Sequence, residues 1–578
     1  MAGRPFSVPK KSKKDKALIN KHLIFSLGVA TAFLCPGRVL ANPLDSAQPT
    51  ILSLETIREE HYLPDFSFAG YENGQVSVPR ASGAVVAVGD FGATPDDGKD
   101  DTQAIVKAIA HANEIAGPVI VRFASGRYRI SGVLKIERSD FVLQGAGQGP
   151  GGTQLHFPRP LNQVDHSDSL DELRQYLIQL DKRQVEPDNN LNDIFSEYSW
   201  SGGFIWIQKP GVRAAPYLEE YDPKIDTLAN VVMGHRGQQK IQLSGSAKIA
   251  AGDIIQVQWI NSSGPEAGIV KSLYGSEYKS AGSHHWSFPN RPLVRQTSRV
   301  LSVSGRTVSL ADPLLHDANA AIPAQIASWD GLQHVGVEDM HLDFPDSPFF
   351  GHHMERGYNG IYFTSAFDSW ARNLRITNAD SGILSYNSAN VTYKDILADG
   401  SRRAHYAVHM GNVHNVLAEN ITVMNPVRHS LTFNTQSTKC VYKNAQVFIR
   451  PTLDQHAGAN HQNLFDNVTL HMEAIPTEDG PVTPVFNGSG AGYWQPGHGA
   501  FNTTWNLRVL ITGGAYPDET VTVQGLDEGP MARIIGLHGN RRFALDYHPK
   551  PYVESLNTQL NLVPSLYDFQ KKQRLKTP

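Results

Sequence analysis

Ionisable side chains recur at matching points of consecutive sequence repeats between residues 358 and 470. Histidine titrates near neutrality and is the usual proton-transfer group, and a guanidinium pairs with a carboxylate in bidentate geometry. Such a row could neutralise an anionic substrate and move a proton on it. The sequence therefore predicts these catalytic residues: Arg403, His405, Arg428, His429, Asp454 and His456.

The repeat that carries this row predicts the fold. Five segments (WARNLRI, TYKDILA, LAENITV, VYKNAQV and LFDNVTL) superpose so that one column holds Asn373, Asp395, Asn420, Asn444 and Asn467, with steps of 22, 25, 24 and 23 residues. A period in this range, carried by short β-branched runs, is typical of a parallel β-solenoid. We expect a right-handed parallel β-helix with an asparagine ladder that is structural, because stacked amides bond to one another.

Stacking the coils predicts which ionisable groups meet. Arg403 and Arg428 are expected one coil apart, about 5 Å, where they repel unless an anion lies between them. His405, His429 and His456 are expected at nearly the same place on three coils. Four further residues are expected near the row as substrate-binding groups: Asp380, Arg402, His409 and His461.

Three loops add candidate substrate-binding residues. A ten-residue surplus between Asp339 and Asn373 carries His353 and Arg356, and inserted solenoid loops commonly form binding walls. The other two loops carry aromatic residues that could stack on a sugar ring: His285 with Trp286, and Trp494.

The N-terminus is typical of a cleaved secretory signal, with a lysine-rich start, a short apolar run and a small-residue site before Asn42. Cleavage predicts an exported bacterial protein, periplasmic or extracellular, with no membrane span. Residues 1–41 carry eight Lys/Arg and one Asp, so the formal charge falls from −4 to −11. This acidity disfavours nucleic-acid binding and makes the arginine-histidine row unusual. Cys440 is then the single mature cysteine, expected to be buried and inert.

A segment after Val85 resembles a known family. Gly89, Asp90, Gly92, Ala93, Asp97, Gly98, Asp101, Thr102, Ala104 and Ile105 follow the motif that opens the solenoid in the pectate-lyase superfamily of carbohydrate-active β-helix proteins. The resemblance implies a right-handed β-helix whose first helix closes one end. It does not discriminate between lyases, glycoside hydrolases and phage tailspikes. The acids of the motif are expected to be structural.

We therefore predict an all-β chain with a capping helix and a small inserted antiparallel β-unit. The expected division is a signal peptide at 1–41, an extension at 42–84, first coils at 85–235, the inserted unit at 236–320, main coils at 321–550 and a tail at 551–578.

The predicted function is a polysaccharide lyase that cleaves an anionic, uronate-containing polysaccharide by β-elimination. Arg403 and Arg428 would neutralise the uronate, His405 or His429 would take its C5 proton, and His456 or Tyr406 would protonate the leaving oxygen. One alternative is a glycoside hydrolase using two of Asp380, Asp399 and Asp454. Another is a noncatalytic glycan-binding protein.

No cofactor is expected. The histidine spacings lack a zinc signature, and the neighbouring arginines disfavour a dication. Ca²⁺ bound by Asp380, Asp399 and Asp454 remains an alternative.

Overall fold

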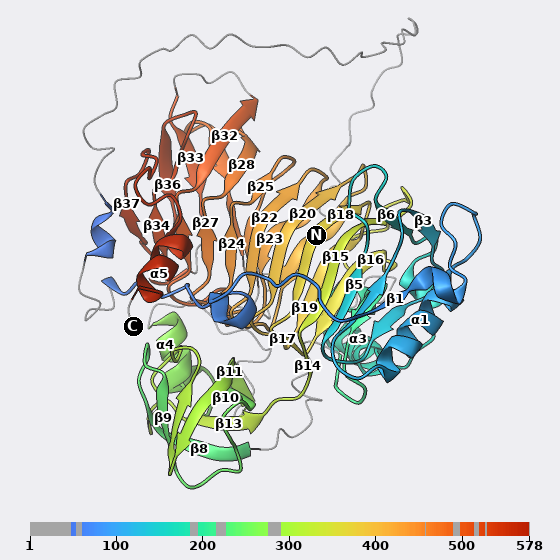
Figure 1. Cartoon of the computed structure of the whole chain (residues 1–578). Coiled ribbons are helices and arrows are strands. Elements are labelled where there is room, and N and C mark those ends of the chain that lie inside the picture. Colours follow the sequence, from blue (N-terminus) through green and yellow to red (C-terminus); the bar gives the residue numbers. More distant parts are fainter. Residues whose placement is uncertain are drawn as a thin grey trace, which may run out of the picture. The chain divides into compact units, whose positions relative to one another are not determined.

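The computed structural model describes residues 48–53, 61–184, 195–214, 227–275, 291–456, 458–488, 497–513, 519–525 and 529–576 (Figure 1). The predicted signal peptide lies outside these residues. So do three of the predicted binding residues: His285, Trp286 and Trp494.

Short parallel strands stack into coils, as the repeat predicts (Figure 1). Trp370 pairs with Thr392, and Thr392 with Leu417, so the superposed segments are neighbouring strands. Within the described residues the largest sheet comprises β1 (Ala84–Ala87), β2 (Val119–Arg122), β3 (Gly126–Arg129), β5 (Phe141–Gln144), β6 (Thr153–His156), β15 (Val335–Asp343), β18 (Trp370–Thr377), β20 (Thr392–Asp399), β22 (Leu417–Val423), β24 (Val441–Lys443), β25 (Gln446–Val447), β27 (Leu464–Asp466), β28 (Thr469–Glu473), β31 (Thr503–Trp505), β32 (Arg508–Gly513), β34 (Arg533–Ile535), β35 (His538–Gly539) and β37 (Tyr552–Glu554). The chain is a right-handed parallel β-helix, which confirms the predicted fold.

A second parallel sheet forms another wall of the coils and carries the predicted row. Its strands are β4 (Leu134–Ile136), β7 (Ile205–Ile207), β16 (Asn359–Thr364), β19 (Ser381–Tyr386), β21 (Ala404–Met410), β23 (Val427–Phe433), β26 (Leu453–Gln455) and β30 (Phe486–Gly488). Smaller parallel sheets contain β29 (Val482–Pro484), β33 (Val521–Gln524) and β36 (Phe543–Asp546), and β14 (Leu332–Gln333) with β17 (Ala366–Phe367).

The asparagine column turns the chain between coils. Asn373, Asp395, Asn420, Asn444 and Asn467 all have φ between 51° and 59°, a left-handed conformation that Asn and Asp tolerate better than other side chains. Their side chains bond along the stack, as from Asn420 Nδ2 to Asp395 Oδ1 at 2.8 Å. The expected structural role of the column is confirmed.

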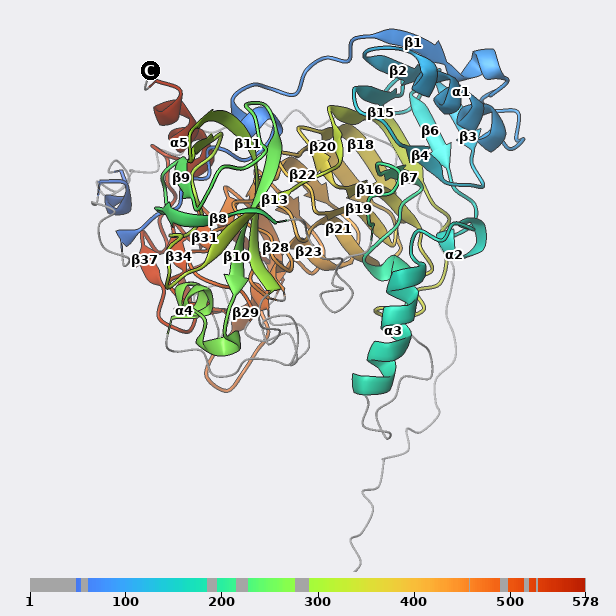
Figure 2. The same ribbon diagram turned by 90° about the horizontal axis from the view of Figure 1, so that it is seen from below.

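Helix α1 (Thr102–Glu114) lies at the first coils, beside β1 to β3 (Figure 2). It buries Ile105, Ala108 and Ile109 in the main core. Asp101 does not cap α1 with its side chain; its Oδ1 accepts from the backbone N–H of Thr94 instead. The motif therefore builds the end of the solenoid.

The inserted unit is a closed antiparallel barrel. Its strands are β8 (Thr227–Gly234), β9 (Lys240–Leu243), β10 (Ile254–Asn261), β11 (Arg291–Ser304), β12 (Thr307–Leu310) and β13 (Ala324–Ser328). It extends beyond the expected 236–320 at both sides, because β8 and β13 pair to close the barrel.

The remaining helices are peripheral. They are α2 (Leu161–Val164), α3 (Asp171–Gln184), α4 (Gly268–Tyr274), α5 (Leu566–Arg574) and five 3-10 turns (Thr50–Leu52, Tyr71–Gly74, Val88–Phe91, Glu197–Ser199 and Gly264–Glu266). The tail packs along the coils, since Leu566 and Tyr567 share a buried cluster with Leu417 and Val441. Among the described residues, no helix has the length and hydropathy of a membrane span.

Candidate active site

The predicted row lies where β19, β21 and β23 begin. Asp380 precedes β19, His405 is the second residue of β21, and His429 is the third residue of β23. The loop between β15 and β16 reaches this place with His352. We use the name corner cluster for seven residues: His352, His353, Glu355, His405, His429, Asp454 and His456.

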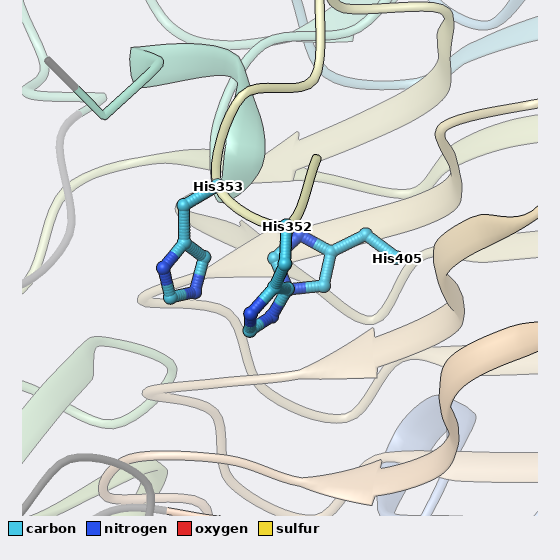
Figure 3. Close-up of side chains that lie close together, drawn as sticks. All are labelled: His352, His353 and His405. Carbon is cyan, nitrogen blue, oxygen red and sulfur yellow. The ribbon is translucent and has the colours of Figure 1, made fainter. Parts of the chain in front are cut away.

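His352 is the centre of the cluster. Its Nε2 lies 3.1 Å from Nε2 of His405 and 3.4 Å from Nε2 of His429. His353 follows it on the same loop, with ring centroids 3.8 Å apart, and Figure 3 shows both rings beside His405. Phe195 and Trp200 pack against His353, each with ring centroids 4.7 Å away. The loop thus brings imidazoles from distant sequence positions together.

Two buried carboxylates lie behind the imidazoles. Glu355 Oε1 is 3.4 Å from Nδ1 of His405, and its Oε2 accepts a 2.8 Å hydrogen bond from Ser199. Asp454 Oδ2 is 3.2 Å from Nδ1 of His429, and its Oδ1 is 3.4 Å from Nδ1 of His456. These contacts orient the rings.

The environment separates the pKa values of the two acids. Burial raises the pKa of Glu355 to about 7. Burial alone would raise the pKa of Asp454 too, but its contacts with the imidazoles of His429 and His456 hold it well below its usual range. Asp454 is therefore ionised at neutral pH.

Burial also keeps the histidines neutral. It lowers the pKa of His352 to about 3, of His353 to about 2 and of His409 to about 3, with neighbouring cationic groups adding to the effect. The pKa values of His405 and His429 fall for the same first reason. At neutral pH these rings offer lone pairs.

The register of the arginines differs from the prediction. Ala404 pairs with Val427, so Arg428 lies opposite His405, and Arg403 does not face Arg428. The sequence repeat could not show this, because the turns before β21 and β23 differ in length. Both arginines are exposed, and Arg403 lies over the ring of Phe349 at 5.3 Å. The charges of both also contribute to the lowered pKa of His352, so both arginines lie near the cluster.

Asp380 and Arg402, predicted to bind substrate, are enclosed. They form an ion pair with side-chain exposures of 0% and 2%. The other oxygen of Asp380 accepts from the backbone N–H groups of Gly357 at 3.0 Å and Tyr358 at 2.8 Å. Because no surface of this pair reaches solvent, it anchors the loop that carries His352 and Glu355.

His461 lies away from the cluster, which corrects its predicted place. Its Nε2 is 2.8 Å from Nε2 of His316, which follows the barrel strand β12, and its Nδ1 is 2.8 Å from the carbonyl oxygen of Ala459. His461 is on a different corner of the coil. His409, by contrast, contacts Tyr406 with ring centroids 4.6 Å apart and is buried beneath the cluster.

The remaining residues singled out from the sequence, and one further arginine, are distributed over the coils. Arg356 is exposed and stacks over Phe350 at 3.7 Å, on the inserted loop. On the coil after Arg428, Arg450 lines a cavity of about 530 Å³ with Thr452, Phe486 and Asn487. Asp399 is on the other sheet, paired with Arg375 at 2.8 Å. Cys440 is buried, and burial raises the pKa of its thiol to about 12, so it is not a nucleophile here.

Sequence reasoning did not select His352 and Glu355 as site residues, although both lie in the recognised loop insertion. The sequence feature that marked this loop was the ten-residue surplus between Asp339 and Asn373. Every ionisable residue on a loop inserted beside a predicted site is therefore a candidate site residue.

One family model matches the start of the coils. Residues 85–161 match the family model described as rhamnogalacturonase A/epimerase, pectate lyase-like. No curated protein matches the chain. Similar solved structures include the Pseudomonas phage phi297 tailspike gp61, with 13% identity, TM-score 0.38 and coverage of 81% of this chain and 78% of that one. The exopolygalacturonase of Thermotoga maritima has 10% identity, TM-score 0.34 and coverage of 84% and 94%.

The mannuronan C-5 epimerase AlgE6 A-module of Azotobacter vinelandii has 11% identity, TM-score 0.32 and coverage of 81% and 98%. The family match covers the capping helix and the first coils, where the opening motif lies. Over these residues the chain is similar to pectate lyase-like proteins, and the parallel coils described above continue beyond the match.

Proposed function

We propose that this protein is an exported enzyme that cleaves an acidic, uronate-containing polysaccharide by β-elimination. One observation carries the proposal: exposed Arg403 and Arg428 lie on the coils that carry the histidine cluster, and this cluster contains a partly exposed imidazole, His456, whose Nδ1 is 3.4 Å from Asp454. A guanidinium group fits the carboxylate of a uronate, and an oriented imidazole fits proton abstraction.

The proposed reaction uses the groups that reach solvent. Arg403 and Arg428 bind the uronate carboxylate and stabilise the charge that develops when C5 loses its proton. His456, whose Nδ1 faces Asp454, takes that proton on Nε2. The C5–H electrons form the C4–C5 double bond while the C4–O4 bond breaks. The same imidazole then returns the proton to O4.

Burial changes the roles expected from sequence. His405 is 0% and Tyr406 1% exposed, so neither is assigned to substrate. His429 is 2% exposed and is assigned to the support of the site through Asp454. The partly exposed His352 and His456 take their place at the surface of the cluster.

The hydrolase alternative loses support from the arrangement of its acids. The carboxylate of Asp380 is enclosed by Arg402, that of Asp399 lies on the other sheet, and that of Asp454 is held by two histidines. A retaining or inverting pair needs two carboxylates that face one glycosidic bond about 5–9 Å apart.

The test is a product assay on a panel of uronate polymers. Elimination gives oligosaccharides that absorb in the ultraviolet and are one water lighter than hydrolysis products, and His456→Ala abolishes them. Arg306→Ala, an exposed arginine of the barrel, is the matched control. Chain shortening without unsaturated ends would establish hydrolysis, and binding without product would establish a glycan-binding protein; either result overturns the proposal.

A further inference from the structure

We propose that the corner cluster binds a divalent transition metal ion of the zinc type through Nε2 of His352, His405 and His429. This inference rests on the positions of the nitrogens and not on the proposed reaction. His352 and His405 belong with His353 to one group of potential ligand atoms that all lie within 4.8 Å of one another, and His429 belongs to a neighbouring group with Asp454 and His456. The proposed ligands bridge these two groups through the contacts of His352.

The separations of the nitrogens match a metal site. Two ligands of a tetrahedral ion bound at about 2.1 Å lie about 3.4 Å from each other. Nε2 of His352 lies 3.1 Å from Nε2 of His405 and 3.4 Å from Nε2 of His429. Nε2 of His352 is therefore about as far from each of the other two nitrogens as two ligands of one tetrahedral ion are from each other.

Hydrogen bonding alone satisfies these atoms poorly. Nδ1 of His405 faces Glu355 and Nδ1 of His429 faces Asp454, so each ring places its proton there when the acid is ionised. Both Nε2 atoms then carry lone pairs directed at His352, which has a single Nε2–H to offer. A cation between the three nitrogens would satisfy all of them.

The carboxylates provide the outer contacts typical of such sites. A histidine that binds a metal usually donates its other N–H to a carboxylate, which fixes the ring and raises its basicity. Here two of the three proposed ligands have a carboxylate oxygen close to Nδ1, that of Glu355 at 3.4 Å and that of Asp454 at 3.2 Å.

The junction between barrel and coils contains an internal comparison. Nε2 of His316 and Nε2 of His461 are 2.8 Å apart. Both Nε2–Nε2 distances given above for the corner cluster are longer. Nδ1 of His461 donates to the carbonyl of Ala459, and Nδ1 of His316 is 3.0 Å from Ser272 Oγ. One N–H then joins the two rings and every nitrogen is satisfied without a metal. A short distance between two histidines is therefore not sufficient to indicate a metal site.

The chemistry of the donor set selects the ion. Imidazole nitrogens suit Zn²⁺ and its neighbours, whereas Ca²⁺ prefers six or more oxygen ligands. Three histidine ligands leave a fourth position open, which is the arrangement of catalytic metal sites. From the histidine spacing in the sequence we expected no cofactor. The proposed ligands come from a loop and two strands, whereas a spacing signature of the zinc type describes ligands on one helix.

The experiment measures metal on the full chain, purified without an affinity tag, after dialysis against Zn²⁺ or Co²⁺ and removal of free ion. We expect one equivalent per chain and a visible Co²⁺ spectrum. His352→Ala, on the half-exposed loop, should weaken Zn²⁺ binding by about 100-fold or more, and Glu355→Gln by about 10-fold. His316→Gln is the matched control and should bind normally.

Less than a tenth of an equivalent in the dialysed protein would overturn the proposal. So would full occupancy in both His352→Ala and a His405→Gln variant whose folding is verified by circular dichroism. Because no substrate is present, these outcomes are independent of whether the protein proves to be a lyase.

Discussion

Two buried clusters of histidine and carboxylate, built from similar residues, differ in what their environment lets them do. The corner cluster has Asp454 between His429 and His456. At the junction, a second cluster consists of His316, His414, His461 and Asp312, and here Nε2 of His414 is 2.8 Å from Asp312. Asp312 also accepts a 2.7 Å hydrogen bond from Gln296. The corner cluster borders exposed arginines and a partly exposed His456, whereas the junction residues are all buried.

The comparison teaches that composition does not identify a site. Sequence placed His461 with the predicted row, and the structure places it in the junction cluster. A buried histidine that is fully hydrogen-bonded contributes to packing. A group of neutral histidines that share one N–H and lie beside exposed cations has unused bonding capacity.

The largest predicted effect is acid destabilisation. Burial lowers the folded-state pKa of His461 to about 3 from an ordinary value of 6.5, so the unfolded chain takes up the proton first and stability falls as pH decreases from about 6.5 to about 3. For this residue the loss between pH 7 and 4 is about 3 kcal/mol. Guanidinium unfolding at both pH values should show a smaller loss in His461→Gln than in the wild type. An equal loss in both proteins would contradict the assigned burial.

Asp454→Asn should reduce lyase activity by about 100-fold, because the amide cannot orient both imidazoles as the carboxylate does. Initial rates of ultraviolet absorbance on the best polymer measure this, with circular dichroism to verify folding. Unchanged turnover in a folded variant would remove the proposed His456–Asp454 pair from the mechanism.

The equivalent change at the junction should separate stability from activity. Asp312→Asn weakens hydrogen bonds to a buried charge and should lower the free energy of unfolding by about 2 kcal/mol. Activity per folded molecule should remain that of the wild type. If activity fell as far as in Asp454→Asn, the distinction between the two clusters would fail.

The smallest effect is expected at the rim of the site. Arg428→Ala should raise KM about tenfold, since an exposed charge pair with substrate contributes on the order of 1 kcal/mol. Rising salt should weaken substrate binding by the wild type and reduce this difference. Arg306→Ala should change neither parameter, and a matching rise in its KM would point to a general charge effect.

The sequence alone determined the coils, because each coil repeats its own strand and turn residues. Local chemistry determines the left-handed turns at Asn373 and Asn420, and the same chemistry recurs in every repeat. It also determines which residues of α1 face the core. It also indicated the strands from which His405, His429 and Asp454 project, and it marked the loop insertion that carries His353.

Only the tertiary structure decided which of these side chains meet. A repeat fixes the strand order, but the length of each turn fixes the register, and a difference in turn length moves Arg403 away from Arg428. The loop conformation depends on the buried Asp380–Arg402 pair, and it is this loop that delivers His352 and Glu355. The path of the barrel decides that His461 meets His316 instead of the site. Contacts between distant segments depend on packing and burial, which no local pattern encodes.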